Sequence, residues 1–288
     1  MVVKTMKDPK KINSKVYESF LKSPYSSLKV STYFNVYDQL LSKYRDKSIV
    51  FLEIGILDGG SLFMWRDFFG PQARIIGVDL NPDAKKWEKE GFEIFIGDQS
   101  SAEFWKNTLN KIGKLDIVLD DGGHTYEQQI MTTESVIPFI NDQGIIIIED
   151  CHTSYMKKFG FKKLSFINYA KHLIDNINKR YAEFNSKTSE KRIWSIQFFE
   201  SIVALHINFY AIGVPSEVIF NQDKEVKAEN FRYASYPILI DKLEKLSQNR
   251  KFKIIKVFLK LFRKLLLNIY HLKIYFRLRQ FLKTKNIF

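Results

Sequence analysis

Two adjacent pairs of carboxylates are the residues of this sequence most suited to hold a metal ion. Asp120-Asp121 and Glu149-Asp150 each follow an aliphatic run that is typical of a buried strand. Because neighbouring parallel strands end at the same edge of a sheet, we expect Asp121, Glu149 and Asp150 to converge. Three carboxylates without a thiolate select a hard cation, with Mg²⁺ ahead of Mn²⁺ and Ca²⁺. The sequence therefore predicts a Mg²⁺ site at these three acids.

A histidine follows the first pair, in the run Asp120-Asp121-Gly122-Gly123-His124. The two glycines permit a tight turn that returns His124 over the same edge of the sheet. An imidazole, with an unperturbed pKa of about 6.5, is the usual general base at neutral pH. Thr125 and Gln128 have the spacing of a capping box, which predicts that a helix begins directly after the histidine. We expect His124 to act as the catalytic base beside Asp121.

Each of these residues also has a simpler interpretation. Asp120 or Asp121 can cap the following helix, and a single histidine is more often a hydrogen-bonded surface residue. His152, two residues after the second acid pair, is an alternative base or a contact to the acceptor. A glycine turn, a histidine and two acid pairs at adjacent strand ends together favour a catalytic site.

A glycine-rich turn marks a second functional region. The apolar run 49–54 ends in the pattern Glu53-x-Gly55-x-x-x-Gly59-x-Ser61 and is followed by large apolar residues at helical spacing. Strand, glycine turn and helix is how an open α/β sheet builds a nucleotide site, although a purely structural turn is an alternative. The spacing lacks the second glycine of the G-x-G-x-x-G pattern that binds dinucleotides.

Two further acid-bearing strand ends predict a parallel, doubly wound sheet. Runs 73–79 and 92–99 end at Asp79 and Asp98-Gln99, and helical segments separate all five predicted strands. Asp79 lies where an acid receives ribose hydroxyls in such folds, or else caps the next helix. Runs 193–199 and 201–208 predict a terminal antiparallel strand pair. So many carboxylates at one edge would raise their own pKa values unless cations or hydrogen bonds offset the charge.

The run Leu119–His124, together with Ile148–Tyr155, resembles the metal-dependent sugar O-methyltransferases of macrolide biosynthesis, of the mycinamicin and tylosin type, and related bacterial polysaccharide enzymes. The glycine turn resembles motif I of the class I S-adenosylmethionine-dependent methyltransferases. The resemblance covers about 48–155 and implies a Rossmann-like fold, S-adenosylmethionine and Mg²⁺, with the base at His124 and the metal at the three acids named above. It implies a cofactor site at Glu53, Gly55, Gly59, Ser61, Asp79, Asp98, Gln99 and Asp120, with Asp98 at the adenine amino group.

We therefore predict Mg²⁺-dependent methyl transfer to a sugar hydroxyl, in a bacterial surface or capsular polysaccharide precursor or in a glycosylated metabolite. One alternative is a methyltransferase acting on RNA or a small amine, for which neither metal nor a strong base is needed. Another is a nicotinamide-dependent oxidoreductase, which the missing dinucleotide pattern opposes. A third is a membrane-tethered binding protein without turnover, which the intact His124 and acid cluster oppose. A homo-oligomer is compatible with any of these.

The positive charge of the chain is concentrated in its last segment. The net charge is +13, and residues 250–288 hold twelve Lys and Arg and no acid, so the remainder carries 13 − 12 = +1. Alternating basic and apolar residues predict a basic amphipathic helix that contacts an anionic membrane. Packing of this helix on the domain is about equally favoured, and the long aliphatic stretch opposes nucleic-acid binding.

We divide the chain into an N-terminal helical segment (1–47), a methyltransferase domain (48–249) and the basic tail (250–288). In the first, residues 32–44 predict a helix packed beside the sheet, or one from which Tyr33 or Tyr37 closes over the cofactor. The single cysteine excludes an intrachain disulfide, and the lysine-rich start lacks the apolar region of a signal peptide. We expect a cytoplasmic protein, with the tail at the inner face of the membrane.

Overall fold

The computed structural model describes residues 12–181, 192–221, 238–248 and 256–285. The chain forms two compact units, Met1–Glu217 and Val218–Phe288. The N-terminal helices α1 (Lys15–Lys22) and α2 (Tyr33–Leu41) belong to the first unit, together with the sheet. The predicted start of the tail at residue 250 lies outside the described residues, and the predicted domain boundaries stay predictions.

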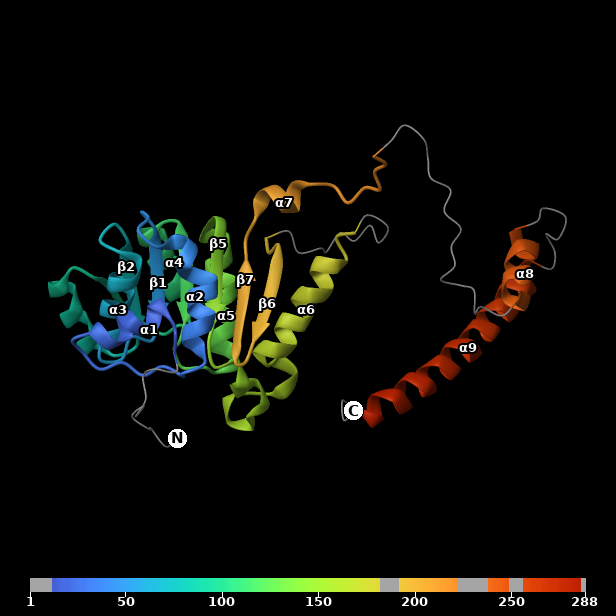
Figure 1. Ribbon diagram of the computed structural model, residues 1–288, viewed down its shortest axis with the longest axis horizontal. Coiled ribbons are helices and arrows are strands. Elements are labelled where there is room, and N and C mark those ends of the chain that lie inside the picture. The colour runs from blue at the N-terminus through green and yellow to red at the C-terminus, as the bar shows by residue number, and fades with distance from the viewer. Residues whose placement is uncertain (1–11, 182–191, 222–237, 249–255, 286–288) are drawn as a thin grey trace. The chain divides into compact units, whose positions relative to one another are not determined.

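The first unit is built on a seven-stranded sheet with the order β3-β2-β1-β4-β5-β7-β6 (Figure 1). Five strands are parallel, and β7 is antiparallel to both β5 and β6. This arrangement confirms the predicted Rossmann-like sheet with its terminal antiparallel pair. The strands are β1 (Val50–Ile54), β2 (Arg74–Asp79), β3 (Glu93–Ile96), β4 (Leu115–Asp120), β5 (Ile140–Ile148), β6 (Ser195–Phe199) and β7 (Ile202–His206).

Helices cover both faces of the sheet because its central strands are apolar on both sides. Along β5, Ile145 and Ile147 pack into one hydrophobic cluster, whereas Ile146 and Ile148 pack into the other. This alternation follows from the two-residue period of a strand. The first cluster includes α1, α2 and α3 (Gly60–Phe69). The second includes α4 (Ala102–Ile112), α5 (Tyr126–Val136) and α6 (Phe166–Asn178).

Local signals at the helix ends agree with the structure. Helix α3 ends at Gly70, which has a φ of 88° that an L-residue rarely adopts. Helix α5 begins with a capping box in which Thr125 and Gln128 each receive the other's backbone N–H. The segment that starts at Asn81-Pro82 is a 3₁₀ helix, η3 (Pro82–Glu90). Because β1 to β5 are parallel, their carboxyl ends lie at one edge of the sheet, where the following loops begin.

The second unit contains two described helices, α8 (Ile238–Gln248) and α9 (Lys256–Thr284), which pack against each other. Helix α9 carries eight Lys and Arg and no acid. Many of its large apolar side chains are exposed, including Phe258 (65%), Leu265 (55%) and Leu272 (53%). In the described part of the chain, no helix combines the length and apolarity needed to cross a membrane.

Candidate active site

A cavity of about 500 Å³ lies at the carboxyl ends of the parallel strands. Its walls come from the turns after β1 to β5 and from the segment between α1 and α2. Eight of the predicted site residues line it: Gly55, Asp79, Asp98, Gln99, Asp121, His124, Glu149 and Asp150. The structure therefore brings the glycine turn and the second acid pair into one space.

Four predicted cofactor residues stand behind the cavity wall. Glu53 is fully buried and accepts hydrogen bonds from the Ser61 hydroxyl (2.6 Å) and the Trp65 indole (3.1 Å). Gly59 faces the ring of Trp87, with which an added Cβ would collide at 2.3 Å. Asp120 is also buried. These residues support the turns that face the cavity.

The glycine turn is pressed against the end of β4. Gly55 has a φ of 82°, and a Cβ at this position would lie 2.2 Å from the carbonyl oxygen of Asp121. Only glycine combines that backbone conformation with so close an approach. Across the turn, the Asp79 carboxylate accepts the backbone N–H groups of Ile56 (2.9 Å) and Asn81 (2.8 Å). Asp79 thus fixes both loops that border this side of the cavity.

Gln99 connects the strand end at β3 with the turn that carries the histidine. Its amide nitrogen donates to Asp120 (3.0 Å) and Thr132 (3.2 Å), and its amide oxygen accepts the N–H of Gly123 (2.9 Å). Asp120 also accepts the N–H of Gly122 at 3.2 Å. Burial raises the pKa of the Asp120 carboxyl to about 6.

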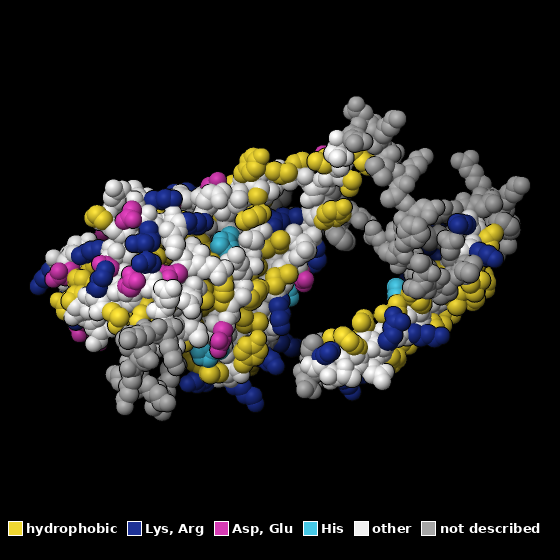
Figure 2. All heavy atoms as spheres, viewed as in Figure 1, with side chains coloured by type: hydrophobic (Ala, Val, Ile, Leu, Met, Phe, Trp, Pro, Cys, Tyr) yellow, Lys and Arg dark blue, Asp and Glu magenta, His cyan; other side chains and the backbone are white. Residues whose placement is uncertain are grey.

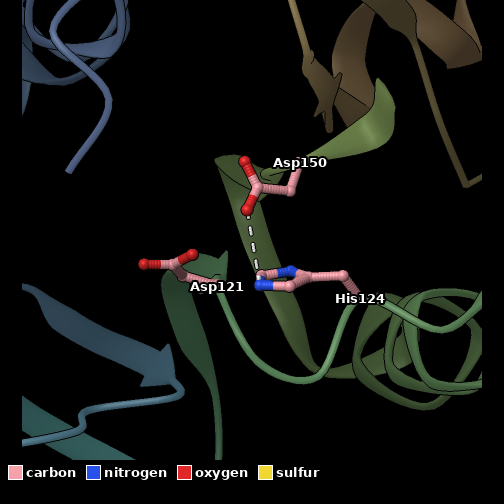
Figure 3. A group of neighbouring side chains, drawn as sticks. All are labelled: Asp121, His124 and Asp150. Atoms are coloured by element: carbon pink, nitrogen blue, oxygen red, sulfur yellow. Dashed lines mark ion pairs between the residues drawn. The ribbon is translucent and has the colours of Figure 1, made fainter. Parts of the chain in front are cut away.

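Asp121, His124 and Asp150 form the outer cluster of the site (Figure 3). Each offers one ligand atom, and these atoms lie within 4.8 Å of one another. The Nε2 atom of His124 lies 3.4 Å from Oδ2 of Asp150. Both residues have left-handed backbones, with φ values of 59° and 53°. Such conformations cost on the order of 1–3 kcal/mol each and concentrate at functional sites.

Glu149 lies behind the outer cluster, with only 1% of its surface exposed. It accepts a hydrogen bond from the hydroxyl of Tyr37, and its Oε2 lies 3.6 Å from the ammonium of Lys29. Burial and the charge of Asp121 hold the pKa of Glu149 well above its usual range. Of the three predicted metal ligands, Asp121 and Asp150 therefore belong to the outer cluster. Glu149 lines the same cavity but contacts Tyr37 and Lys29.

Lys29 is the site residue that sequence reasoning missed. Its ammonium lies 2.7 Å from Asp121, 3.4 Å from Glu53 and 3.6 Å from Glu149, and its side chain is 1% exposed. Burial lowers the pKa of Lys29, but the three carboxylates outweigh this effect and hold it above its usual range. The sequence held only a general sign of such a residue: so many acids at one edge of the sheet require a cation nearby.

The alternative base lies beside the cavity and does not line it. The Nδ1 atom of His152 is 2.5 Å from the hydroxyl of Ser201 and 3.9 Å from Oδ1 of Asp150. Its side chain is 42% exposed. Cys151, directly before it, is buried. The roles assigned to both histidines remain predictions.

The donor set of the outer cluster fits a hard divalent cation. The carboxylates of Asp121 and Asp150 face a small space beside the His124 imidazole, and a third carboxylate, Glu149, lies directly behind them. Lys29 supplies one positive charge to Glu53, Asp121 and Glu149, which leaves Asp150 and much of the negative charge to another cation. Oxygen-rich sites of this kind suit Mg²⁺ or Mn²⁺.

Comparisons with known proteins agree with the resemblance noted in the sequence. Residues 52–151 match a family model described as a methyltransferase domain. Mycinamicin VI 2''-O-methyltransferase of Micromonospora griseorubida is 34% identical over 131 residues, which are 43% of this chain and 32% of that protein. A rhamnosyl tetracenomycin-C 2'-O-methyltransferase of Streptomyces olivaceus is 26% identical over 190 residues, which are 60% and 49% of the two chains. This chain thus spans about a third to a half of the length of these relatives.

A solved structure shows the same fold. The MycE methyltransferase of the mycinamycin biosynthetic pathway, in complex with Mg and SAH, is 25% identical, with a TM-score of 0.59. The match covers 68% of this chain and 54% of that one. A second crystal structure of that enzyme also contains Mycinamycin VI, with a TM-score of 0.59 and 26% identity.

Proposed function

We propose that this chain, which carries a methyltransferase domain in residues 52–151, transfers a methyl group from S-adenosylmethionine to a sugar hydroxyl with the help of Mg²⁺. The observation that carries the proposal is a cavity of about 500 Å³ that contains both halves of such a site. The glycine turn with Asp79 and Asp98 lies in the same space as the cluster of Asp121, His124 and Asp150.

The cofactor half consists of the turns after β1, β2 and β3. We assign the ribose hydroxyls to Asp79 and the adenine amino group to Asp98. Asp79 already accepts two backbone N–H groups, which orient its carboxylate for further hydrogen bonds. Gly55 lets the backbone approach the ligand closely. The positively charged sulfonium would face a cavity rich in carboxylates, which favours its binding.

The metal half consists of Asp121, Asp150 and, behind them, Glu149. A divalent ion, when bound there, supplies positive charge that lowers the pKa of a nearby sugar hydroxyl. We assign His124 as the base, with Asp150 orienting its ring from 3.4 Å. The imidazole takes the hydroxyl proton while the oxygen attacks the methyl carbon; the new O–C bond forms as the C–S bond breaks. S-adenosylhomocysteine leaves with the bonding electrons on sulfur.

The acceptor is a glycosylated molecule in this proposal. The relatives are named for methyl transfer to mycinamicin VI and to rhamnosyl tetracenomycin-C, both of them glycosylated small molecules. A glycosylated metabolite is therefore the first acceptor class to test, and a precursor of a surface polysaccharide is the second. We assign contact with such an acceptor to His152, whose ring lies beside the cavity, 2.5 Å from the hydroxyl of Ser201.

Calorimetric titration with S-adenosylhomocysteine tests the proposal, with NADH as the competing ligand. We expect binding of the first and none of the second. Methyl transfer from labelled S-adenosylmethionine to rhamnosylated acceptors should then stop when EDTA removes the metal. Binding of NADH alone would favour an oxidoreductase, and transfer to RNA or amines that survives EDTA would favour the other methyltransferase class.

We also propose that α9 places the enzyme on an anionic membrane at the cytoplasmic side. Basic and apolar side chains are mixed around α9, so the predicted amphipathic separation is weak. The proposal rests on its eight basic residues, its exposed apolar side chains and the absence of an acid in this helix. Figure 2 shows yellow and dark blue side chains along this helix. The full-length chain should sediment with phosphatidylserine vesicles and not with phosphatidylcholine vesicles.

Two exposed residues of α9 give the matched variant for this experiment. Leu272→Asp with Phe276→Asp should abolish sedimentation, because both side chains are more than half exposed and would enter the lipid. Leu164→Asp, at an exposed position of the first unit (68%), is the control that should leave sedimentation unchanged. Equal sedimentation of all three proteins would overturn the membrane proposal.

A further inference from the structure

Residues 155–164, which follow the second acid pair, present both lysines and large apolar side chains to solvent. We call this stretch the lysine segment. Tyr155 is 72% exposed, Phe161 84% and Leu164 68%. The segment also holds four exposed lysines: Lys157, Lys158, Lys162 and Lys163. Lysines beside exposed aromatic rings are suited to bind an anion that is attached to a ring or an apolar group.

The charge of the lysine segment contrasts with that of the chain around it. Residues 1–249 carry a net charge of +1, and residues 151–174 contain five Lys and no acid, so the remainder of this part carries 1 − 5 = −4. The cavity of the proposed site is itself lined by carboxylates. An anionic group of a ligand would therefore be repelled by the cavity and attracted by the lysine segment.

Hydrogen bonds hold the lysine segment next to the turn that carries His124. Tyr126, the first residue of α5, donates its hydroxyl to the carbonyls of Thr153 (3.0 Å) and Met156 (2.9 Å). The Thr153 hydroxyl donates to the carbonyl of His124 at 3.1 Å. At Gly160 an added Cβ would lie 2.5 Å from the Tyr126 ring, so the segment folds back onto the start of the same helix.

The lysine segment begins within reach of a ligand that is bound at the acids. Residues Cys151–Tyr155 form the 3₁₀ helix η5, which rises about 2 Å per residue, so Tyr155 lies about 10 Å from Asp150. The N–H of Cys151 donates to the carbonyl of Ser201 at 2.9 Å, beside the turn between β6 and β7 (Figure 1). A sugar whose hydroxyls contact the acids can thus extend its linking group toward the lysines.

We propose that the lysine segment binds a phosphate or diphosphate that links the acceptor sugar to its carrier. This inference rests on the proposed function and narrows its acceptor to a sugar phosphate. The lysines pair with the phosphate oxygens, and the rings of Tyr155 and Phe161 contact the sugar or the apolar part of the carrier. The carrier is a nucleoside or an isoprenoid lipid, which share this linkage. Of the two acceptor classes proposed above, the polysaccharide precursors contain such sugars.

Calorimetric titration tests this inference without turnover. The probes are rhamnose 1-phosphate and the neutral methyl rhamnoside, in the presence of Mg²⁺ and S-adenosylhomocysteine. The native protein should bind the phosphate about tenfold more tightly, because four exposed ion pairs are each weak but act together. Replacement of all four lysines by glutamine should make the two affinities equal. Lys106→Gln with Lys111→Gln, at exposed positions of α4, is the control that should keep the native ratio.

Three results of this titration would overturn the inference. The first is no binding of rhamnose 1-phosphate to the native protein, and the second is equal affinity for the two probes. The third is a preference for the phosphate that survives the loss of the four lysines in a protein with the native circular dichroism spectrum. If the four-glutamine protein also lost sedimentation with phosphatidylserine vesicles, the segment would be a membrane contact instead.

Turnover separates the inference from the proposed function and identifies the carrier. A preference for the phosphate that needs the lysines, without methyl transfer to any rhamnosylated acceptor, would support the phosphate site and contradict the proposed function. Rhamnose on a nucleoside diphosphate and rhamnose on an isoprenoid diphosphate distinguish the two carriers, because the true carrier should give the lower KM. Values of KM no lower than that of methyl rhamnoside for both would overturn the inference.

Discussion

The hydroxyl of Tyr33 donates a hydrogen bond to the carboxylate of Asp150 at 2.5 Å, across 117 residues of sequence. Tyr33 lies at the start of α2, and Asp150 follows β5 with a left-handed backbone. Burial and the bond to Asp150 raise the pKa of the Tyr33 hydroxyl, so it remains a donor at all ordinary pH values. An N-terminal helix thus holds one carboxylate of the outer cluster in place.

Replacement of Tyr33 by phenylalanine should weaken Mg²⁺ binding roughly 10- to 100-fold, because a hydrogen bond to a charged group contributes about 1.5–3 kcal/mol. The measurement is calorimetric titration with Mg²⁺. Tyr44→Phe is the matched control: its hydroxyl donates to the carbonyl of Gln143 at 2.6 Å and touches none of the acids of the site. Equal affinities in all three proteins would show that Tyr33 does not position Asp150.

Replacement of His124 by alanine should lower kcat by roughly 10²–10⁴-fold, which is the usual contribution of a general base. Binding of S-adenosylhomocysteine should stay within about twofold of native, because the residues assigned to the cofactor, Asp79 and Asp98, follow β2 and β3 rather than β4. His172→Ala, at an exposed position of α6, serves as the control. Turnover retained in His124→Ala would transfer the role of base to His152, whose variant would then be made.

Replacement of Asp79 by asparagine should weaken binding of S-adenosylhomocysteine roughly tenfold or more, because charge-assisted hydrogen bonds to the ribose would become neutral ones. Each carboxylate oxygen of Asp79 accepts one N–H, Oδ2 from Ile56 and Oδ1 from Asn81, so asparagine keeps one of these two bonds. Asp83→Asn, an exposed acid in the next helix, is the control. Native affinity in Asp79→Asn would reduce Asp79 to a support of the two loops.

His206, which lies outside the site, should make the free energy of unfolding depend on pH. Burial, and to a lesser degree the charge of Lys43, lowers its pKa to about 4. Between about pH 4 and the unfolded value of about 6.5, the unfolded chain binds more protons, so the free energy of unfolding rises with pH. This contribution is complete above pH 6.5 and is lost as the pH falls to 4. After allowance for partial exposure it amounts to about 1–2 kcal/mol.

Chemical denaturation between pH 4 and pH 7 measures this contribution. His206→Gln should show a shallower pH dependence than the native protein by that amount. His172→Gln, with its exposed ring, should follow the native curve. Parallel curves for His206→Gln and the native protein would show that His206 titrates normally.

The parallel strands and the glycine turn were predictable because each rests on local signals. Apolar runs that end in acids define the parallel strands, and the conformation of Gly55 follows from its place in the turn. The contacts of Lys29 with the acids of the site were not predictable in the same way. Lys29 stands in a polar stretch with no periodicity, and its contact with Asp121 spans 92 residues. Only the packing of the α1–α2 segment against α3 brings the two together.

The aromatic residues of α2 illustrate the same limit. Their helical spacing predicted a face packed beside the sheet, and Tyr33 and Tyr37 are indeed buried there. Their hydroxyls reach Asp150 and Glu149, which the sequence pattern did not show. The pattern identifies which face is buried, whereas the partner of a polar atom at the edge of that face depends on the loops opposite.

The contacts of Gln99 mean that the two halves of the cavity are not separate modules. The amide side chain of Gln99, which follows β3, donates to Asp120 and accepts the N–H of Gly123, directly before His124. A substitution at Gln99 on the nucleotide side would therefore also disturb the turn that carries His124. Tolerated change at residue 99 would require a compensating change in the 122–124 turn, so these positions should vary together or hardly at all.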